Sequence, residues 1–178
     1  MSAESKQHLV MDDFISLTYQ EELTPTLQRF GEHLLAGRIV GHRSPSGNVY
    51  VPGRGYDPLT LDLTTDDDEV QVADTGTLTA FTVITPIQYY GQQETQPFVM
   101  GSVVFDGASN AIAQQRIHIS HEEVRSGLRV RSIWKSVGDR SLVGMSNRWW
   151  GGLECAIAGF EPTGEPDVAE EWVKEHIF

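Results

Sequence analysis

The stretch that decides the fold reads GRIVGHRSPSGNVYVPGRGYDPLT and covers residues 37–60. It has the outline of a zinc ribbon, with turns at 44–47 (SPSG) and 57–60 (DPLT) where two Cys-x-x-Cys knuckles would hold the metal. Structural zinc needs four soft or borderline donors, usually thiolates, because these offset the charge of the dication. Serine and threonine hydroxyls stay protonated at neutral pH, and the only cysteine, Cys155, lies far downstream. We therefore predict a hairpin that folds without metal, and residues 59–63 are expected to extend it.

A helix is predicted directly before this hairpin. Thr24 is a suitable N-cap, Pro25 fits the first helical position, and Gly37 can end the helix in a left-handed conformation. Apolar residues between them recur at helical spacing, so one face of the helix should pack against a partner surface. These residues are Leu27, Phe30, Leu34 and Leu35.

From residue 70 onward the apolar residues recur with a period of two, which is typical of strands. Five segments rich in β-branched and aromatic residues predict strands at 76–84, 98–105, 112–119, 128–137 and 154–160. The turn at 106–110 should join the second and third strands as a hairpin. Between the third and fourth strands, Ser120 and Glu123 form a capping box that predicts a helix of about two turns, closed by Gly127. A short helix at this place is typical of the OB-fold, a five-stranded Greek-key barrel.

The chain is therefore expected to be mainly β. We assign residues 1–23 to an N-terminal arm, 24–63 to the helix and degenerate ribbon hairpin, 70–162 to the OB-fold barrel, and 163–178 to a C-terminal helix. Pro166 stands near the start of the last helix, and the acidic residues that follow suit its first turns, where the helix dipole stabilises anions. An insertion at 137–153 separates the fourth and fifth strands of the barrel.

The charge and cysteine content of the chain exclude some classes of function. The 178 residues carry a net charge of −12 and no run of Lys or Arg, so we do not expect nucleic acid as a partner. A single cysteine excludes an intramolecular disulfide, and neither a leader nor a long apolar run is present, so we expect a soluble cytoplasmic protein. Cys155 lies among apolar residues and is interpreted as an inert core thiol. The acidic run 64–69 lacks the ligand spacing of an EF-hand loop and is interpreted as a solvated surface loop.

The order of these segments resembles a known family. The helix, Gly37-Arg38, the ribbon-like hairpin, TGTLTAFTV at 75–83 and VRSGLRV at 124–130 follow one another as in the acyl-CoA-associated OB-fold family called domain of unknown function thirty-five, or DUF35. The resemblance spans roughly residues 24–162 and implies a rubredoxin-like hairpin followed by an OB barrel. This chain departs from the family at the knuckles. One cysteine position is deleted, and the others correspond to Ser44, Asp57 and Thr60, so no cofactor, and in particular no zinc, is expected.

The resemblance also implies a function. Members of the family are companions of thiolase-superfamily enzymes, so we expect a non-catalytic accessory subunit that binds a thiolase or a lipid-transfer-protein-type steroid side-chain aldolase and supports its acyl-CoA chemistry. The sequence lacks motifs for a catalytic serine, a dinucleotide or a phosphate loop. Two alternatives stay open. One is an autonomous acyl-CoA hydratase or thioesterase that uses His118 or His121 with Glu122; the other is a single-strand nucleic-acid-binding OB module, which the acidic charge disfavours.

Two sets of residues are candidates for binding. Positively charged residues cluster in the sequence near the hairpin: Arg38, His42, Arg43 and Arg54. They could bind coenzyme A phosphates or an acidic partner. The alternative is an ordinary solvated hairpin. Aromatic residues beside an arginine are typical of interaction hot spots. A surface for the partner enzyme is therefore expected at Trp149, Trp150, Arg148, Tyr89 and Tyr90, the alternative for the tryptophans being a loop that folds back onto the protein.

Overall fold

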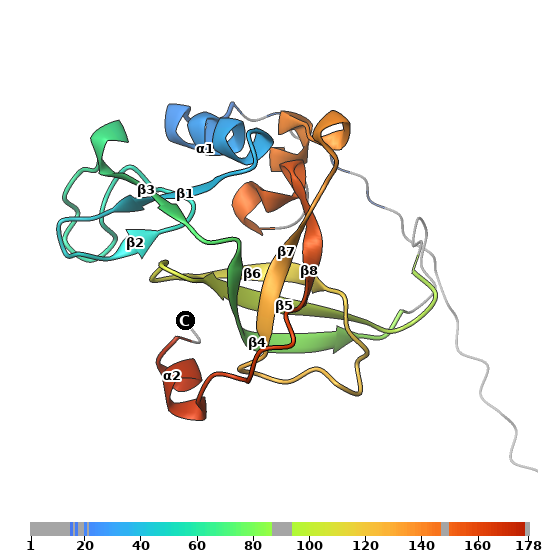
Figure 1. Ribbon diagram of the computed structural model, residues 1–178. Coiled ribbons are helices and arrows are strands. Elements are labelled where there is room, and N and C mark those ends of the chain that lie inside the picture. The colour runs from blue at the N-terminus through green and yellow to red at the C-terminus, as the bar shows by residue number, and fades with distance from the viewer. Residues whose placement is uncertain are drawn as a thin grey trace, which may run out of the picture.

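The computed structural model describes residues 15, 17, 20, 22–86, 94–146 and 150–176 (Figure 1). None of the helices in these ranges is long and apolar enough to cross a membrane. In chain order the elements are α1 (Pro25–Leu35), β1 (Ile39–Arg43), β2 (Val49–Tyr50), η1 (Asp66–Asp68), β3 (Glu69–Val72), β4 (Thr75–Ile84), β5 (Phe98–Phe105), β6 (Ala111–Ile117), β7 (Arg129–Trp134), η2 (Val137–Asp139), η3 (Leu142–Ser146), η4 (Trp150–Cys155), β8 (Ile157–Pro162) and α2 (Glu170–Glu175), where η marks a 3-10 helix.

Strands β4 to β8 close into a barrel in the order β4-β5-β6-β8-β7, and β7 returns to pair with β4. Neighbouring strands are antiparallel except for β6 and β8, which pair in parallel at Ile117 and Phe160. The fifth strand of the barrel thus lies between the third and the fourth, which is the Greek-key order of the OB-fold. The predicted mainly β fold with a five-stranded OB barrel is confirmed.

A second, smaller sheet lies beside the barrel in the order β2-β1-β3, with α1 next to it (Figure 1). We call residues 39–72, which form this sheet and its loops, the ribbon. In the ribbon β1 pairs antiparallel with both neighbours, placing His42 opposite Tyr50 and Ile39 opposite Val72. Asn110, from the turn between β5 and β6, binds both polar groups of the Val51 backbone: it accepts from the amide at 2.8 Å and donates to the carbonyl at 2.8 Å.

Helix α1 begins and ends where its sequence predicts. The Thr24 hydroxyl accepts a hydrogen bond from the Leu27 amide at 3.3 Å, and Gly37 follows the helix with a φ of 77°, a conformation that favours glycine. The insertion between β7 and β8 packs on this helix. Arg140 donates to the Leu35 carbonyl at 3.0 Å and so satisfies a group that the helix end leaves unpaired.

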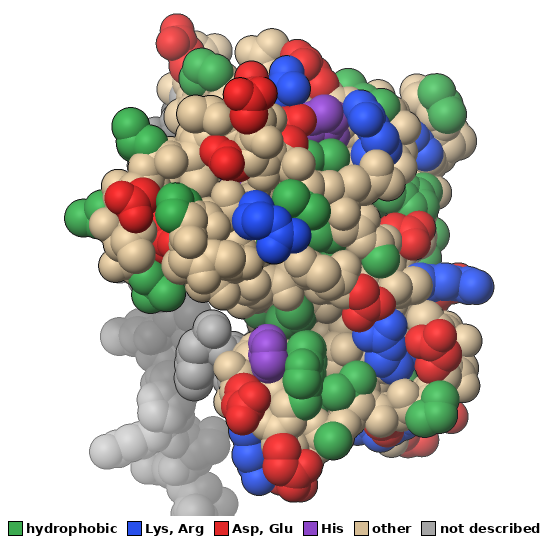
Figure 2. All heavy atoms as spheres, turned by 60° about the vertical axis from the view of Figure 1, so that its left-hand side comes forward, with side chains coloured by type: hydrophobic (Ala, Val, Ile, Leu, Met, Phe, Trp, Pro, Cys, Tyr) green, Lys and Arg blue, Asp and Glu red, His purple; other side chains and the backbone are tan. Residues whose placement is uncertain are grey.

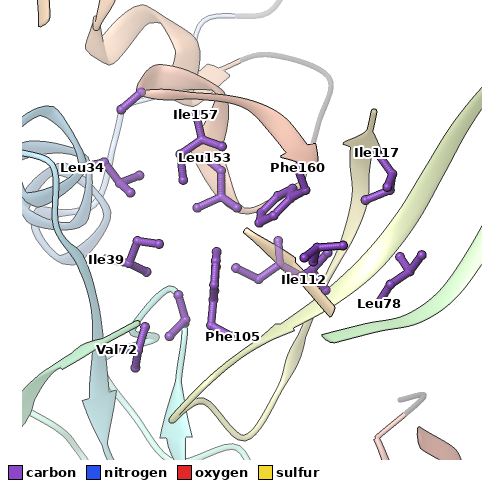
Figure 3. Close-up of a cluster of buried hydrophobic side chains, with 14 of the residues drawn as sticks. Leu34, Ile39, Val72, Leu78, Phe105, Ile112, Ile117, Leu153, Ile157 and Phe160 are labelled. Atoms are coloured by element: carbon purple, nitrogen blue, oxygen red, sulfur yellow. The ribbon is translucent and has the colours of Figure 1, made fainter. Parts of the chain in front are cut away.

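One hydrophobic core joins the helix, the ribbon and the barrel. Leu34 of α1 and Ile39 of β1 point into the same interior as Phe105 and Phe160 of the barrel (Figure 3), whose ring centroids are 5.7 Å apart. Cys155 belongs to this core, as predicted, and burial raises its pKa to about 11. Because the ribbon contributes apolar side chains to a shared core, it is held by packing as well as by Asn110.

Two helix predictions were wrong in extent. Residues 121–123 form only a turn, in which the amides of Glu123 and Val124 both bond to the Ser120 carbonyl, and no helix follows before β7. Gly127 instead donates to Leu78 of the barrel, so the chain leaves the turn to reach the sheet. The C-terminal helix α2 begins at Glu170 rather than near Pro166, because the Val168 amide bonds to the Gly127 carbonyl and holds the preceding residues extended along the barrel.

Candidate functional site

The two turns that stand in place of zinc knuckles meet inside the ribbon. Ser44 and Asp57 are buried, at 4% and 0% exposure. The Ser44 and Ser46 hydroxyls lie 2.8 Å apart, and the Ser44 hydroxyl donates to the Asn48 carbonyl at 3.2 Å. The Asn48 side-chain amide donates to Ser46 Oγ at 3.0 Å. Hydrogen bonds between small polar side chains therefore hold the first turn in shape.

Asp57 anchors the second turn. Its Oδ1 accepts a hydrogen bond from the Leu59 amide at 2.8 Å, whereas no group in the described ranges has hydrogen-bond geometry with Oδ2. The nearby Ser46 hydroxyl has the largest effect on this carboxyl group. Together with the Leu59 amide and the Ser44 hydroxyl, and against burial, it lowers the pKa of Asp57 to about 2. The ribbon thus holds an ionised carboxylate in its interior at neutral pH.

Residues 55–64 form a compact loop, which we call the leucine loop. Its ends are joined by a hydrogen bond from the Thr64 amide to the Gly55 carbonyl at 3.0 Å, and the Asp57 amide donates to the Asp62 carbonyl at 2.8 Å. At its apex the Leu61 amide donates to the Asp57 carbonyl at 2.8 Å. Three leucines of the loop are strongly exposed: Leu59 at 74%, Leu61 at 73% and Leu63 at 80%.

The expectation that residues 59–63 extend the hairpin was wrong. The leucine loop is not a strand, and Leu63 makes a single isolated β-bridge, to Tyr56. The physical reason is the bond from Leu59 to the Asp57 side chain, which turns the chain, together with the φ of 64° at Leu61. A residue in the left-handed region interrupts the extended backbone of a strand.

A cavity of about 430 Å³ lies beside this loop. It is bordered by the start of α1, the ribbon segment 51–56 and the start of β6. Apolar side chains such as Leu27, Pro52 and Ile112 line it, and Arg54 brings a positive charge to its wall. Within the described ranges the Arg54 guanidinium makes no hydrogen bond or ion pair, so it can bind an anion at the mouth of the cavity.

Comparison with known proteins finds a family model and solved structures that are similar to this chain. The family model described as ChsH2, C-terminal OB-fold domain, matches residues 69–135, which hold β3 to β7. The crystal structure of a DUF35-family protein of unknown function from Sulfolobus solfataricus has a TM-score of 0.50 and 19% identity, and the match covers 64% of this chain and 79% of that one. A chain of the Ltp2-ChsH2(DUF35) aldolase has a TM-score of 0.53 and 15% identity, with 80% and 98% covered. The family-model match and the two shared folds support a DUF35 OB-fold family for the barrel.

At these identities the two solved structures show a shared fold and nothing finer. No curated protein matches this chain. The family-model match is confined to residues 69–135, which belong almost entirely to the barrel.

The donors of this ribbon do not fit zinc. Asp57 is the one ionised group at the knuckle positions, the Ser44 hydroxyl is already bonded within its turn, and the Thr60 hydroxyl donates to Asp62 at 2.6 Å. Tetrahedral structural zinc requires four soft or borderline ligands. Among the residues that the structure describes, no three His, Cys, Asp or Glu side chains gather as a metal site.

The four cationic residues expected beside the hairpin do not share one position. Arg38 bonds to His33 Nδ1 at 3.0 Å at the end of α1, and Arg43 lies at 3.4 Å from the Gly47 carbonyl across the hairpin turn. His42 is buried at 7% exposure, with Nδ1 3.2 Å from the Thr64 hydroxyl. Arg54 alone of the four lines the cavity. In the described part of the chain no hydrogen bond joins any two of them.

The expected aromatic interface falls mostly outside the described residues. This holds for Tyr89, Tyr90, Arg148 and Trp149, and for the side chain of Trp150, which opens η4. The surface that sequence reasoning missed is the leucine loop. Its signal was available as three leucines at 59, 61 and 63 beside an acidic stretch, but the segment was interpreted as an extension of the hairpin.

Proposed function

We propose that this chain is a non-catalytic accessory subunit that binds a thiolase-superfamily enzyme, of the thiolase or steroid side-chain aldolase type, and supports its acyl-CoA chemistry. The observation that carries the proposal is the likeness to ChsH2. Residues 69–135 match its C-terminal OB-fold domain, and the chain shares its fold with 98% of a chain from the Ltp2-ChsH2(DUF35) aldolase. An aldolase subunit is therefore the first partner to test.

The described side chains favour binding over catalysis. His118 and His121 are both exposed, and neither bonds to Glu122 within the described ranges. A general base in a hydratase or thioesterase needs such an orienting partner and a site sheltered from water. The Cys155 thiol is buried and has a pKa of about 11, so it is not a thiolate nucleophile at neutral pH.

Co-expression tests the proposal directly. The chain is produced together with the thiolase-superfamily subunit encoded beside its gene, and the pair is passed over a size-exclusion column. We expect one peak that contains both chains, and a change in the enzyme's acyl-CoA turnover when this subunit is withheld. Separate elution with unchanged turnover would overturn the proposal.

A contact with coenzyme A is part of the proposal, and it points to Arg54. Because this guanidinium lies at the wall of the cavity, it can meet an acyl-CoA phosphate, and Arg54→Met should weaken acetyl-CoA binding by the complex about tenfold. Isothermal titration calorimetry measures the affinity. Arg43→Met, at the far hairpin turn, is the control and should leave the affinity unchanged; equal effects of both variants would exclude a specific contact at Arg54.

We also propose that the folded subunit contains no zinc. The hydroxyl and carboxylate donors at Ser44, Asp57 and Thr60 support this, since they are poor ligands for structural zinc. Elemental analysis of protein purified without chelator should find less than stoichiometric zinc, and treatment with a chelator should leave the unfolding midpoint unchanged. One zinc per chain, lost together with stability, would contradict the prediction.

A further inference from the structure

We propose that the leucine loop, residues 55–64, is the element by which this chain docks on its partner enzyme. The occupant that fits it is a protein surface with an apolar depression bordered by Lys and Arg side chains. The inference rests on the proposed function, since that function names the class of partner, and it adds which surface makes the contact.

The leucine loop exposes several large apolar side chains close together. Single exposed leucines are common on protein surfaces, but here three of five consecutive residues are leucines exposed by 73% or more. Tyr56, in the same loop, is exposed by 42%. Concentrated apolar side chains of this kind mark interaction surfaces, and burying them removes apolar area from water.

Hydrogen bonds within the loop hold it in the conformation that exposes these leucines. The Asp57 carboxylate, fully buried, accepts from the Leu59 amide, and the Asp57 backbone bonds to both Leu61 and Asp62. Leu61 itself has a φ of 64°, where a side chain is unfavourable and glycine is preferred. A strained leucine in a hydrogen-bonded loop is the kind of local strain found at binding sites. A preformed loop also loses little entropy when it binds.

The charge around the leucines favours one kind of partner surface. Residues 55–69 contain no Lys, Arg or His, and Asp62, Asp66 and Asp67 are exposed beside the leucines. Figure 2, which brings the ribbon side forward, shows hydrophobic and acidic side chains interleaved along its left-hand edge. A depression bordered by Lys and Arg is complementary to this pattern. A second copy of this chain, with a net charge of −12, or an anionic lipid surface would be repelled.

The test uses the co-expressed complex of the full chain with its enzyme subunit. Leu59→Ser, Leu61→Ser and Leu63→Ser are combined in one variant, and the affinity for the enzyme subunit is measured by calorimetry at two salt concentrations. We expect a loss of affinity of about a hundredfold, because the leucines are the apolar anchors of the contact. Asp62→Lys with Asp67→Lys should slow association and reduce its dependence on salt.

The matched control is Val137→Ser with Val143→Ser. These valines are exposed to the same degree, 78% and 75%, but belong to η2 and η3. They should leave the affinity unchanged. Leu61→Gly separates folding from binding, since it keeps the turn, relieves the left-handed strain and should still lower the affinity. If wild type binds the enzyme and the triple variant binds equally well, the inference is wrong while the proposed function stands.

A second measurement covers the case in which wild type does not bind that enzyme, which would refute the proposed function. Benzoylphenylalanine is incorporated at position 61 of the full chain in its native cells, and the photo-crosslinked product is identified by mass spectrometry. A product with one defined protein, absent when the probe is moved to position 143 and with basic residues around the crosslink, supports the docking surface. Products with only a second copy or with lipid, or no product, overturn it.

Discussion

At the scale of single residues, Asp57 makes the stability of the ribbon depend on pH. Its pKa in the folded protein is about 2, below the ordinary value of 3.8. A carboxyl group with a depressed folded pKa stabilises the fold above its unfolded pKa and loses this contribution as the pH falls through the folded one. The contribution of Asp57 is therefore complete above about pH 5 and is lost between about pH 4 and about pH 2.

The variant Asp57→Asn should change this part of the pH profile. Since it cannot titrate, its free energy of unfolding should fall less between pH 5 and pH 2 than that of wild type, although it starts lower at neutral pH. Urea unfolding at several pH values measures the difference. Asp67→Asn, on the exposed helix η1, is the control and should follow the wild-type profile. Parallel profiles for Asp57→Asn and wild type would show that this carboxylate does not govern the acid transition.

Individual residues also show which parts of the site could be predicted from sequence. The Thr24 cap and the Gly37 stop act on neighbours within a few positions, so their roles could be predicted. His42 was expected among exposed cations, yet it is buried against Gly53 and bonds to Thr64, 22 positions away. Such a burial depends on how β1 and the later loop meet, and local sequence carries no information about it.

At the scale of elements, the turn between β5 and β6 connects the ribbon to the barrel. Asn110 makes two hydrogen bonds with Val51, and Ser109 accepts from the Val49 amide at 3.0 Å. Asn110→Ala leaves the Val51 amide and carbonyl without these partners and should lower the free energy of unfolding by about 2 kcal/mol. Hydrogen exchange should show faster exchange at β1 and β2 than in wild type, with little change in β4. Equal acceleration in ribbon and barrel would contradict a local role for this turn.

Elements were predictable where periodicity and turn chemistry agreed, as in α1 and the five barrel strands. The prediction for the leucine loop failed because its leucine and polar residues alternate as they do in a strand. The hydrogen bond to Asp57 that bends the chain cannot be read from this alternation. The helix predicted after Ser120 is shorter than expected because of contacts with the barrel. Its capping residues favour a helix, but after one turn the Gly127 amide donates a hydrogen bond to the Leu78 carbonyl of the barrel.

At the scale of the whole molecule, Arg129 of β7 draws together segments from across the barrel. Its guanidinium donates to Asp106, after β5, at 2.7 and 2.5 Å, to Thr77 of β4 at 3.0 Å and to Glu165, after β8, at 3.2 Å. The hydrogen bond from Arg129 holds the pKa of Asp106 below its ordinary value. One side chain thus fixes the place where the barrel closes.

Removing this side chain should destabilise the entire fold. Arg129→Met leaves Asp106 partly buried without its cation and should lower the free energy of unfolding by about 2 kcal/mol. Arg131→Met is the matched control, because Arg131 pairs with Glu161 in an exposed position on the same strand and should change stability by less than about 0.5 kcal/mol. Urea unfolding compares the two variants. A loss of equal size in both would mean that the closure of the barrel does not depend on Arg129.

The burial of Cys155 has a practical consequence for labelling. It is the only cysteine of the chain, and because its thiol is buried and has a pKa of about 11, we expect it to react little with maleimides at neutral pH. A cysteine substituted for an exposed residue such as Thr65 would therefore be the sole reactive thiol. Fluorophores or spin labels could be placed next to the leucine loop without first replacing Cys155 in the core.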